Sequence, residues 1–220
     1  MEKKFLPGLP GLTTQNIYCI GRNYAAHARE LNNPVPDRPV IFTKPVASLT
    51  LDKTILIPSF VKDPHYEAEL VIAIGRMGKH IAAENALSHV AGYGLGIDVT
   101  ARDIQMDLKK NAHPWFLAKG LDTFAPVSSF IEASSVTDPQ NLSFSLTVNG
   151  TLRQSGNTSH MLFPVTELIA TLSGYVTLYP GDLIFTGTPE GVGKLNDGDL
   201  LHAELEPGLI YLDIHVRADM

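Results

Sequence analysis

Short apolar runs separated by turn-forming residues make up most of this chain. Runs of this kind, bounded by Gly, Pro and Asn, are typical of β-strands. They predict strands over residues 17–21, 40–45, 54–58, 67–75 and 92–98, and one that enters a Gly-rich loop within residues 183–193. Two longer segments alternate between apolar and polar residues on both sides of a turn, which predicts β-hairpins. They cover residues 142–156, with a turn at Asn149-Gly150, and residues 200–216, with a turn at Pro207-Gly208.

Helical periodicity is confined to separate segments of the chain. Apolar residues recur there with the spacing of one helix face. The segments are 22–31, 82–93, 99–110 and 163–175. Because strands dominate and the helices are few, the pattern favours a β-rich α+β fold. We expect an irregular lead-in over residues 1–16 and a single domain over residues 17–220.

Composition and charge argue against several kinds of partner. The 220 residues carry a net charge of −6, and the basic residues form no dense run of the kind that marks nucleic-acid binding. No apolar run approaches the length of about 18 residues that a membrane-spanning helix needs. The N-terminus also lacks an apolar stretch of signal-peptide length. We therefore expect a cytoplasmic protein without nucleic acid or membrane as a partner.

Two carboxylates stand at the start of the apolar run 67–75. In a strand, Glu67 and Glu69 point to the same face, while Ala68 and Leu70 point to the opposite, buried face. Two acids this close repel each other unless a cation lies between them. Hard cations such as Mg²⁺ and Mn²⁺ prefer oxygen ligands of this type. A solvated polar edge of the strand is the alternative.

His27 and Glu30 stand three residues apart on the predicted helix 22–31, so they share one face of it. A glutamate that accepts a hydrogen bond from one imidazole nitrogen selects the tautomer and leaves the other nitrogen free to take a proton from water. The pair is thus a candidate general base. The alternative is an exposed pair on a surface that also carries Arg29.

Asp98, Arg102 and Gln105 are spaced at i, i+4 and i+7. A helix that begins near residue 98 would place all three along one stripe. Asp98 is then a candidate third oxygen ligand, and Arg102 and Gln105 could donate to a substrate carboxylate, which the planar guanidinium meets at two points. The alternative is that Asp98 caps the helix and Arg102 lies on a solvated face.

Lys119 and Lys44 are each flanked by apolar residues, and a snorkelling surface lysine is the alternative to a functional role for either. The loop 186–193 is rich in small residues that let backbone N–H groups approach a ligand, and Thr188 adds a hydroxyl. Its spacing does not match a phosphate-binding P-loop, so a plain turn is the alternative. The sequence also contains no G-x-S-x-G elbow and no Cys/His cluster with zinc spacing.

Five motifs follow one another in the order and spacing of a known family. They are GRNYAAHARE, the E-x-E strand, GYGLGIDVTARDIQ, AKGLDTFAPV and FTGTPEGVG. Together they resemble the fumarylacetoacetate hydrolase family, in its short single-domain branch of acylpyruvate hydrolases. The resemblance runs from about residue 16 to the end of the chain. It implies a mixed β-sandwich or β-roll, a homodimer and a small keto-acid substrate.

The resemblance also implies roles for the candidate residues. These are a Mg²⁺ or Mn²⁺ ion held by Glu67, Glu69 and Asp98, a catalytic His27–Glu30 dyad on a mobile lid helix, a catalytic Lys119, and substrate contacts from Arg102, Gln105, Thr188 and Lys44. The longer fumarylacetoacetate enzymes have a further Asp ligand ahead of the His. This chain has no acid between Glu2 and Glu30, which leaves coordination sites for water and substrate and argues against fumarylacetoacetate itself as the substrate.

These observations lead to one hypothesis with several alternatives. The hypothesis is a divalent-metal-dependent hydrolase that cleaves a C–C bond of 3-acylpyruvates or related β-diketo acids, such as fumarylpyruvate or acetylpyruvate. The same enolate-stabilising site would suit oxaloacetate decarboxylation, keto–enol tautomerisation or a 2-hydroxymuconate-type isomerisation. An inactive metal-binding relative that serves as an interaction partner is the non-enzymatic alternative.

Overall fold

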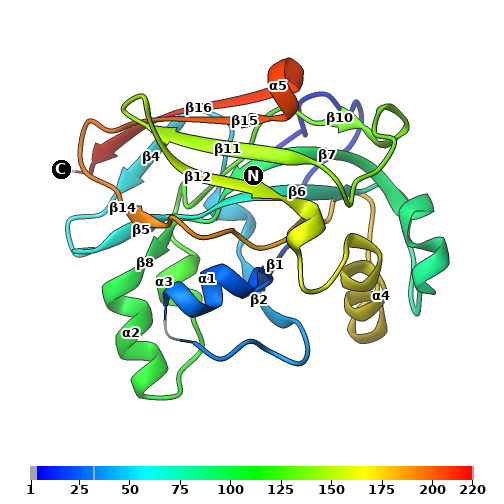
Figure 1. Ribbon diagram of the computed structural model, residues 1–220, viewed down its shortest axis with the longest axis horizontal. Coiled ribbons are helices and arrows are strands. Elements are labelled where there is room, and N and C mark those ends of the chain that lie inside the picture. Colours follow the sequence, from blue (N-terminus) through cyan, green and yellow to red (C-terminus); the bar gives the residue numbers. More distant parts are fainter. Residues whose placement is uncertain (1–3, 32, 220) are drawn as a thin grey trace.

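The computed structural model describes residues 4–31 and 33–219, which form two main sheets packed face to face (Figure 1). The six-stranded sheet contains, in spatial order, β10 (Ile131–Glu132), β7 (Val90–Ile97), β6 (Ala68–Ile74), β13 (Leu183–Phe185), β1 (Ile17–Gly21) and β2 (Val40–Lys44). The five-stranded sheet contains β12 (Thr151–Asn157), β11 (Ser143–Val148), β15 (Leu200–Leu205), β16 (Ile210–Ala218) and β4 (Thr54–Ile57). The predicted β-rich α+β fold is confirmed.

Smaller elements surround these sheets. The short strands are β3 (Leu49–Thr50), β5 (Pro64–Tyr66), β8 (Thr100–Ala101), β9 (Ala125–Pro126) and β14 (Gly193–Lys194). The α-helices are α1 (Ala25–Glu30), α2 (Arg102–Lys110), α3 (Phe116–Lys119), α4 (Val165–Tyr175) and α5 (Glu206–Leu209). The 3₁₀ helices are η1 (Val46–Ser48), η2 (Ala83–His89), η3 (Ala133–Ser135) and η4 (Thr158–His160). In Figure 1, α1, α2 and α3 gather on one side of the view and α4 lies on the other.

The central strand β6 is buried on both of its faces. Leu70 and Ile72 belong to the larger core, which lies between the two main sheets. Val71 and Ala73 point the other way, into a second core that also contains Leu6 from the N-terminal lead-in. Each large apolar side chain buried in this way stabilises the fold by roughly 1.5–3 kcal/mol. The strand therefore holds the residues at its beginning on a rigid base.

The two predicted hairpins are confirmed as β11–β12 and β15–β16. In the first, Asn149 and Gly150 both have positive φ angles, 52° and 75°. Positive φ at both central residues is the requirement of the tight turn that matches the twist of paired strands. The second hairpin turns through α5, where Gly208 has a φ of 83°.

The segment predicted as a helix over 82–93 is different in the structure. It forms the 3₁₀ helix η2, and strand β7 already begins at Val90. Val90 pairs with Ile74, and the N–H of Gly75 donates to the carbonyl of His89 over 2.8 Å. Pairing with the buried strand β6 thus prevails over the local helical periodicity.

Two predicted helices are shorter than expected. The segment predicted over 99–110 becomes helical only at Arg102, because Thr100 and Ala101 pair with β5. The segment predicted over 22–31 becomes helical at Ala25, after Arg22 with its φ of 60°. In both cases, residues expected on a helix instead lie at the junction between a strand and a helix.

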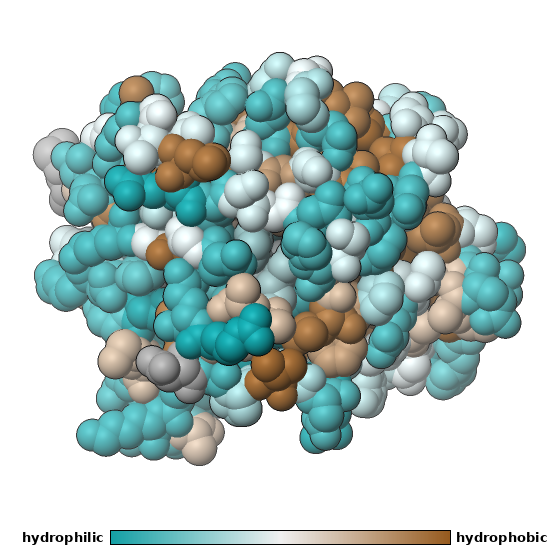
Figure 2. All heavy atoms as spheres, viewed as in Figure 1, coloured by the Kyte–Doolittle hydropathy of each residue, from teal (hydrophilic) through white to brown (hydrophobic). Residues whose placement is uncertain are grey.

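The surface and the helix lengths bear on the prediction that a membrane is not a partner of this protein. The face shown in Figure 2 is mostly hydrophilic, with apolar side chains in small separate groups. In the described part of the chain, every helix is too short or too polar to cross a membrane.

Candidate metal centre and catalytic dyad

Three carboxylates meet where β6 and β7 lie side by side. Glu67 directly precedes β6, Glu69 lies within it, and Asp98 directly follows β7. The antiparallel register pairs Ala68 with Ile97, and the N–H of Asp98 donates to the carbonyl of Glu67 over 2.8 Å. One oxygen of each carboxylate lies within 4.8 Å of the others, and all three residues are buried. The alternative of a solvated strand edge is therefore wrong.

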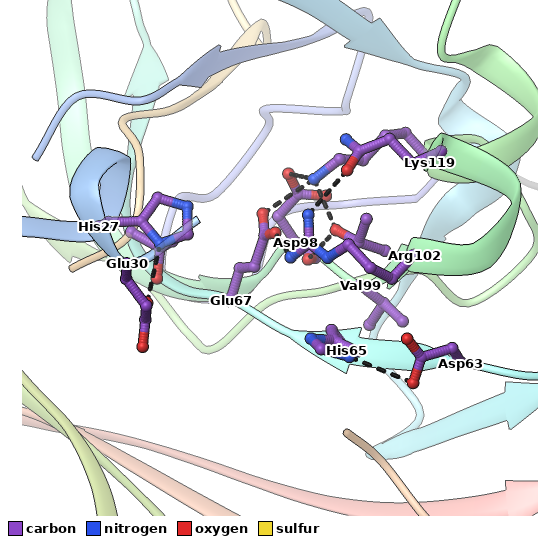
Figure 3. A network of polar contacts seen from close by, with 12 residues as sticks. His27, Glu30, Asp63, His65, Glu67, Asp98, Val99, Arg102 and Lys119 are labelled. Atoms are coloured by element: carbon purple, nitrogen blue, oxygen red, sulfur yellow. Dashed lines mark hydrogen bonds and ion pairs between the residues drawn. The ribbon is translucent and has the colours of Figure 1, made fainter. Parts of the chain in front are cut away.

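Two lysines, Lys119 (labelled in Figure 3) and Lys44, place positive charge inside this carboxylate cluster. Lys119 Nζ lies 2.8 Å from Glu67 Oε2 and 2.5 Å from Asp98 Oδ2. It also donates to the hydroxyl of Thr100. Lys44 Nζ lies 2.7 Å from Asp98 Oδ1. Because Lys119 and Lys44 expose only 2% and 3% of their surface, the snorkelling alternative is wrong for both.

Arg102 reaches the same cluster from α2. Its Nη2 lies 2.5 Å from Glu67 Oε1, and its Nη1 donates to Gln105 Oε1 over 2.7 Å. The expected single stripe is only partly correct, because Asp98 follows a strand and α2 begins at Arg102 after an N-cap at Ala101. Asp98 is thus not a helix cap, and the buried Arg102 is not on a solvated face. Arg102 and Gln105 share one face of α2, and tertiary structure brings Asp98 to the same cavity.

The cluster pushes the pKa values of its two glutamates in opposite directions. Burial alone would raise the pKa of Glu67, but Lys119 and Arg102 outweigh this effect and hold that pKa well below its usual range. Burial, together with the charges of Asp98 and Glu67, raises the pKa of Glu69 well above its usual range. Glu69 is therefore the carboxylate that gains most from an added cation.

Lys119→Met is expected to destabilise the metal-free protein by about 3–5 kcal/mol, because it leaves Glu67 and Asp98 buried without their shared cation. A divalent cation would replace the lost charge, so Mg²⁺ should restore more stability to the variant than to the wild type. Urea unfolding with and without Mg²⁺ measures both effects. Lys110→Met, on the exposed side of α2, is the control and should change stability little. A loss that Mg²⁺ leaves undiminished would contradict the charge-balancing role.

His27 and Glu30 form the predicted pair on α1, beside the carboxylate cluster (Figure 3). His27 Nδ1 lies 3.3 Å from Glu30 Oε2, and His27 is only 5% exposed, so the alternative of an exposed surface pair is wrong for His27, although Glu30 lies at the surface. The other oxygen of Glu30 accepts the N–H of Gly191 over 3.0 Å. Glu30 thus joins α1 to the Gly-rich loop. Because Glu30 contacts Nδ1, Nε2 is the ring nitrogen of His27 that remains free to exchange a proton.

The start of α1 is anchored by Asn23, a residue that sequence reasoning missed. Its buried side chain donates to the carbonyls of Phe163 and Thr186 over 3.1 and 2.8 Å and accepts the N–H of Phe163 over 2.8 Å. The only available signal was a polar residue in the first turn of the segment predicted as a helix over 22–31. The lid motion of α1 stays a prediction.

One cavity joins the carboxylate cluster to His27. Its empty volume is about 400 Å³, part of which is open to solvent. Most of the predicted site residues line it: His27, Glu67, Glu69, Asp98, Arg102, Gln105, Lys119 and Thr188. Glu30 and Lys44 do not line the cavity, but Glu30 contacts His27 and Lys44 contacts Asp98.

Gln154 organises the side of the cavity formed by Thr188. Its Nε2 donates to Thr188 Oγ1 over 2.8 Å, and its Oε1 accepts the N–H of Ala68 over 2.9 Å. The hydroxyl of Thr188 donates to the carbonyl of Ala68 over 2.8 Å. The hydroxyl proton of Thr188 is therefore already used in this hydrogen bond. A contact between Thr188 and substrate stays a prediction. Gln154 escaped the sequence analysis, although it is a polar residue at an inward position of an alternating strand.

Arg22, Lys109 and Trp115 also line the cavity, and the sequence analysis did not single them out. Lys109 lies one helical turn beyond Gln105. Extending the predicted stripe by one step along the helix would therefore have identified Lys109. No sequence periodicity predicts the position of Arg22, because this position depends on the turn between β1 and α1.

The donor set suits a hard divalent cation. It offers only carboxylate oxygens, which Mg²⁺ and Mn²⁺ prefer. Asp98 Oδ1 is buried, and among residues 4–31 and 33–219 its partner is the ammonium of Lys44, 2.7 Å away, which occupies only one of its lone pairs. Such an oxygen has a lone pair available for a metal. Glu67, Glu69 and Asp98 together can therefore hold Mg²⁺ or Mn²⁺.

Known proteins resemble this chain along most of its length. It is 46% identical over 188 residues to the oxaloacetate tautomerase FAHD1, mitochondrial, of Arabidopsis thaliana, covering 85% of this chain and 84% of that protein. It is 41% identical over 210 residues to the mitochondrial oxaloacetate decarboxylase of Dictyostelium discoideum, covering 94% of each chain. The crystal structure of fumarylpyruvate hydrolase from Pseudomonas aeruginosa, in complex with Mn²⁺ and pyruvate, superposes with a TM-score of 0.92 at 36% identity, covering 100% of this chain and 98% of the other.

The fold and the carboxylate centre define a strand-rich domain with three carboxylates that could hold a divalent metal. The family described as "Fumarylacetoacetate (FAA) hydrolase C-terminal" matches residues 16–217, and the chain belongs to this family. The predicted resemblance is thereby confirmed. Some relatives carry mitochondrial names, so the cytoplasmic location stays a prediction, as do the homodimer and the boundary between residues 1–16 and 17–220.

Proposed function

We propose that the protein is a divalent-metal-dependent hydrolase that cleaves a C–C bond of 3-acylpyruvates to give pyruvate and a carboxylic acid. The observation that supports this proposal is the position of His27, which shares one cavity with Glu67, Glu69 and Asp98. A base held beside a metal site is the combination that hydrolysis of a β-diketo acid requires.

Each side chain has its own role in the proposed hydrolysis. His27, oriented by Glu30, takes a proton from water at Nε2, and the resulting hydroxide adds to the carbonyl of the acyl group. The bond between that carbonyl carbon and the neighbouring CH₂ then breaks, and the pyruvate enolate leaves and takes up a proton. Arg102 and Gln105 orient the keto-acid carboxylate. When bound, the divalent cation supplies Lewis-acid stabilisation of the negative charge that develops on oxygen.

Oxaloacetate tautomerisation is the second candidate, and sequence similarity favours it. The tautomerase of Arabidopsis thaliana is 46% identical to this chain, compared with 36% for the fumarylpyruvate hydrolase. Tautomerisation moves a proton between carbon and oxygen and needs no attacking water. His27 is placed to carry that proton as well, so the dyad supports both reactions. Oxaloacetate decarboxylation, the named activity of the Dictyostelium relative, passes through the same type of enolate.

A panel of substrates tests the proposal. Initial rates would be measured on acetylpyruvate, on fumarylpyruvate, and on oxaloacetate for both enol decay and release of CO₂, each with Mn²⁺ and with excess chelator. The proposal expects metal-dependent cleavage of an acylpyruvate. Tautomerisation without cleavage would replace it with the second candidate, and inactivity on every substrate would favour a non-enzymatic relative.

The pH dependence of hydrolysis should report His27. Burial lowers the pKa of His27 below its usual value near 6.5, although Glu67 and Glu30 oppose the effect. The neutral base is thus present at pH 7, and kcat/KM should fall only as the pH drops below about 6.5. Glu30→Gln removes a contact that raises this pKa, so the variant's acidic limb should move further down. An acidic limb above pH 6.5 in the wild type would contradict the assignment.

A further inference from the structure

Two cations of the cavity have no part in the mechanism proposed above. Arg22 lies between β1 and α1, and Lys109 lies in the last turn of α2. Both line the cavity that contains Glu67 and His27, but both are only half-buried, so they occupy its outer part. Within residues 4–31 and 33–219, neither side chain has a hydrogen bond or an ion pair with a protein acceptor.

The other cations of the site already contact its carboxylates. Lys119 contacts Glu67 and Asp98, and Arg102 contacts Glu67. Arg22 and Lys109 are therefore the cations lining this cavity that have no such contact in the described part of the chain. A divalent cation held by those carboxylates would increase the positive excess.

The positive charges of Arg22 and Lys109 repel each other. Burial, followed by the charges of Arg102 and Arg22, lowers the pKa of Lys109 to about 8. Lys109 Nζ also lies 5.2 Å from the centre of the Trp115 ring, a cation–π contact that keeps the ammonium at the cavity wall. Half-buried like charges of this kind are relieved by an anion that binds between them.

We propose that Arg22 and Lys109 form an outer anion subsite that receives a carboxylate at the far end of the substrate. This inference rests on the proposed function, because it places the keto-acid end of the substrate at Glu67, Glu69 and Asp98. The preferred ligands are then 2-keto acids that carry a second carboxylate. The planar guanidinium of Arg22 meets a carboxylate at two points, and the ammonium of Lys109 adds a compact charge.

Binding of matched unreactive keto acids tests the subsite without relying on turnover. Calorimetry on the Mn²⁺-loaded protein at pH 7 would compare 2-oxoglutarate with 2-oxopentanoate, and 2-oxoadipate with 2-oxohexanoate. In each pair a terminal carboxylate is replaced by a methyl group, and the two pairs differ in length. We expect the wild type to bind at least one diacid roughly tenfold more tightly than its partner, as one charge-assisted contact provides.

Variants assign this preference to the two residues. Arg22→Gln and Lys109→Gln should each reduce it, and the double variant should abolish it. Lys109→Arg keeps the charge and should retain most of it. Lys110→Gln is the matched control, because it removes an exposed lysine next to Lys109 that does not line the cavity. Retained binding of Mn²⁺ by the double variant would show that the protein remains folded.

The outcomes separate this inference from the proposed function. A wild type that binds both members of each pair equally overturns the subsite, as does a preference that survives in the double variant. A preference that depends on Arg22 and Lys109 supports the subsite, even if the protein cleaves none of the acylpyruvates. Acylpyruvate cleavage without such a preference leaves the proposed function intact and overturns the subsite alone.

Discussion

Glu69→Gln is expected to lower the affinity for Mn²⁺ and Mg²⁺ by more than about 100-fold and to remove most of the activity. Changes of residues that only orient a metal ligand typically cost about 10–100-fold, so the loss of a ligand should cost more. Glu69 is buried to 98% and its side chain has no direct ion pair in the described part of the chain, so metal binding is the interaction that ionises it. Gln keeps the shape and can still accept the N–H of Gly187.

Calorimetry with Mn²⁺ measures the affinity, and thermal unfolding shows whether the variant remains folded. Glu84→Gln, which changes an exposed acid on η2, is the matched control and should bind Mn²⁺ like the wild type. Because the pKa of Glu69 is raised well above its usual range, protons compete with the metal, and wild-type affinity should rise with pH. Full activity after exhaustive chelation, with metal content verified as nil, would refute the metal site.

His27→Ala is expected to lower acylpyruvate hydrolysis by about 10²–10⁴-fold, the usual contribution of a placed general base. His27 is not one of the three carboxylates that can hold the metal, so Mn²⁺ binding should survive. Oxaloacetate decarboxylation needs no attacking water, and its loss should be smaller. His160→Ala, which changes an exposed histidine on η4, is the control.

Steady-state kinetics on acetylpyruvate and oxaloacetate, measured for both histidine variants, give the comparison. Near-normal hydrolysis by His27→Ala would show that this residue does not activate water, and the tautomerase or isomerase function would then become the better proposal. If oxaloacetate tautomerisation falls as far as hydrolysis does, His27 carries the proton in that reaction as well.

Much of the candidate site was predictable because its residues follow local periodicities. Glu67 and Glu69 share a face in any strand, whatever surrounds it. His27 and Glu30 share a face of any helix, even one that begins only at Ala25. The same reasoning placed Asp98 on a helix, because it could not foresee that Thr100 and its neighbour pair with β5.

By itself, the sequence determined the strand-rich class, both hairpins and the carboxylate and histidine pairs, since each depends on the spacing of neighbouring residues. Only the tertiary structure decided how the charges are balanced. Lys44 on β2 and Lys119 on α3 meet Asp98 through ion pairs between segments that are far apart in the chain. Local periodicity contains no information about such contacts, because they depend on which strands pair and on how deeply the pairs are buried.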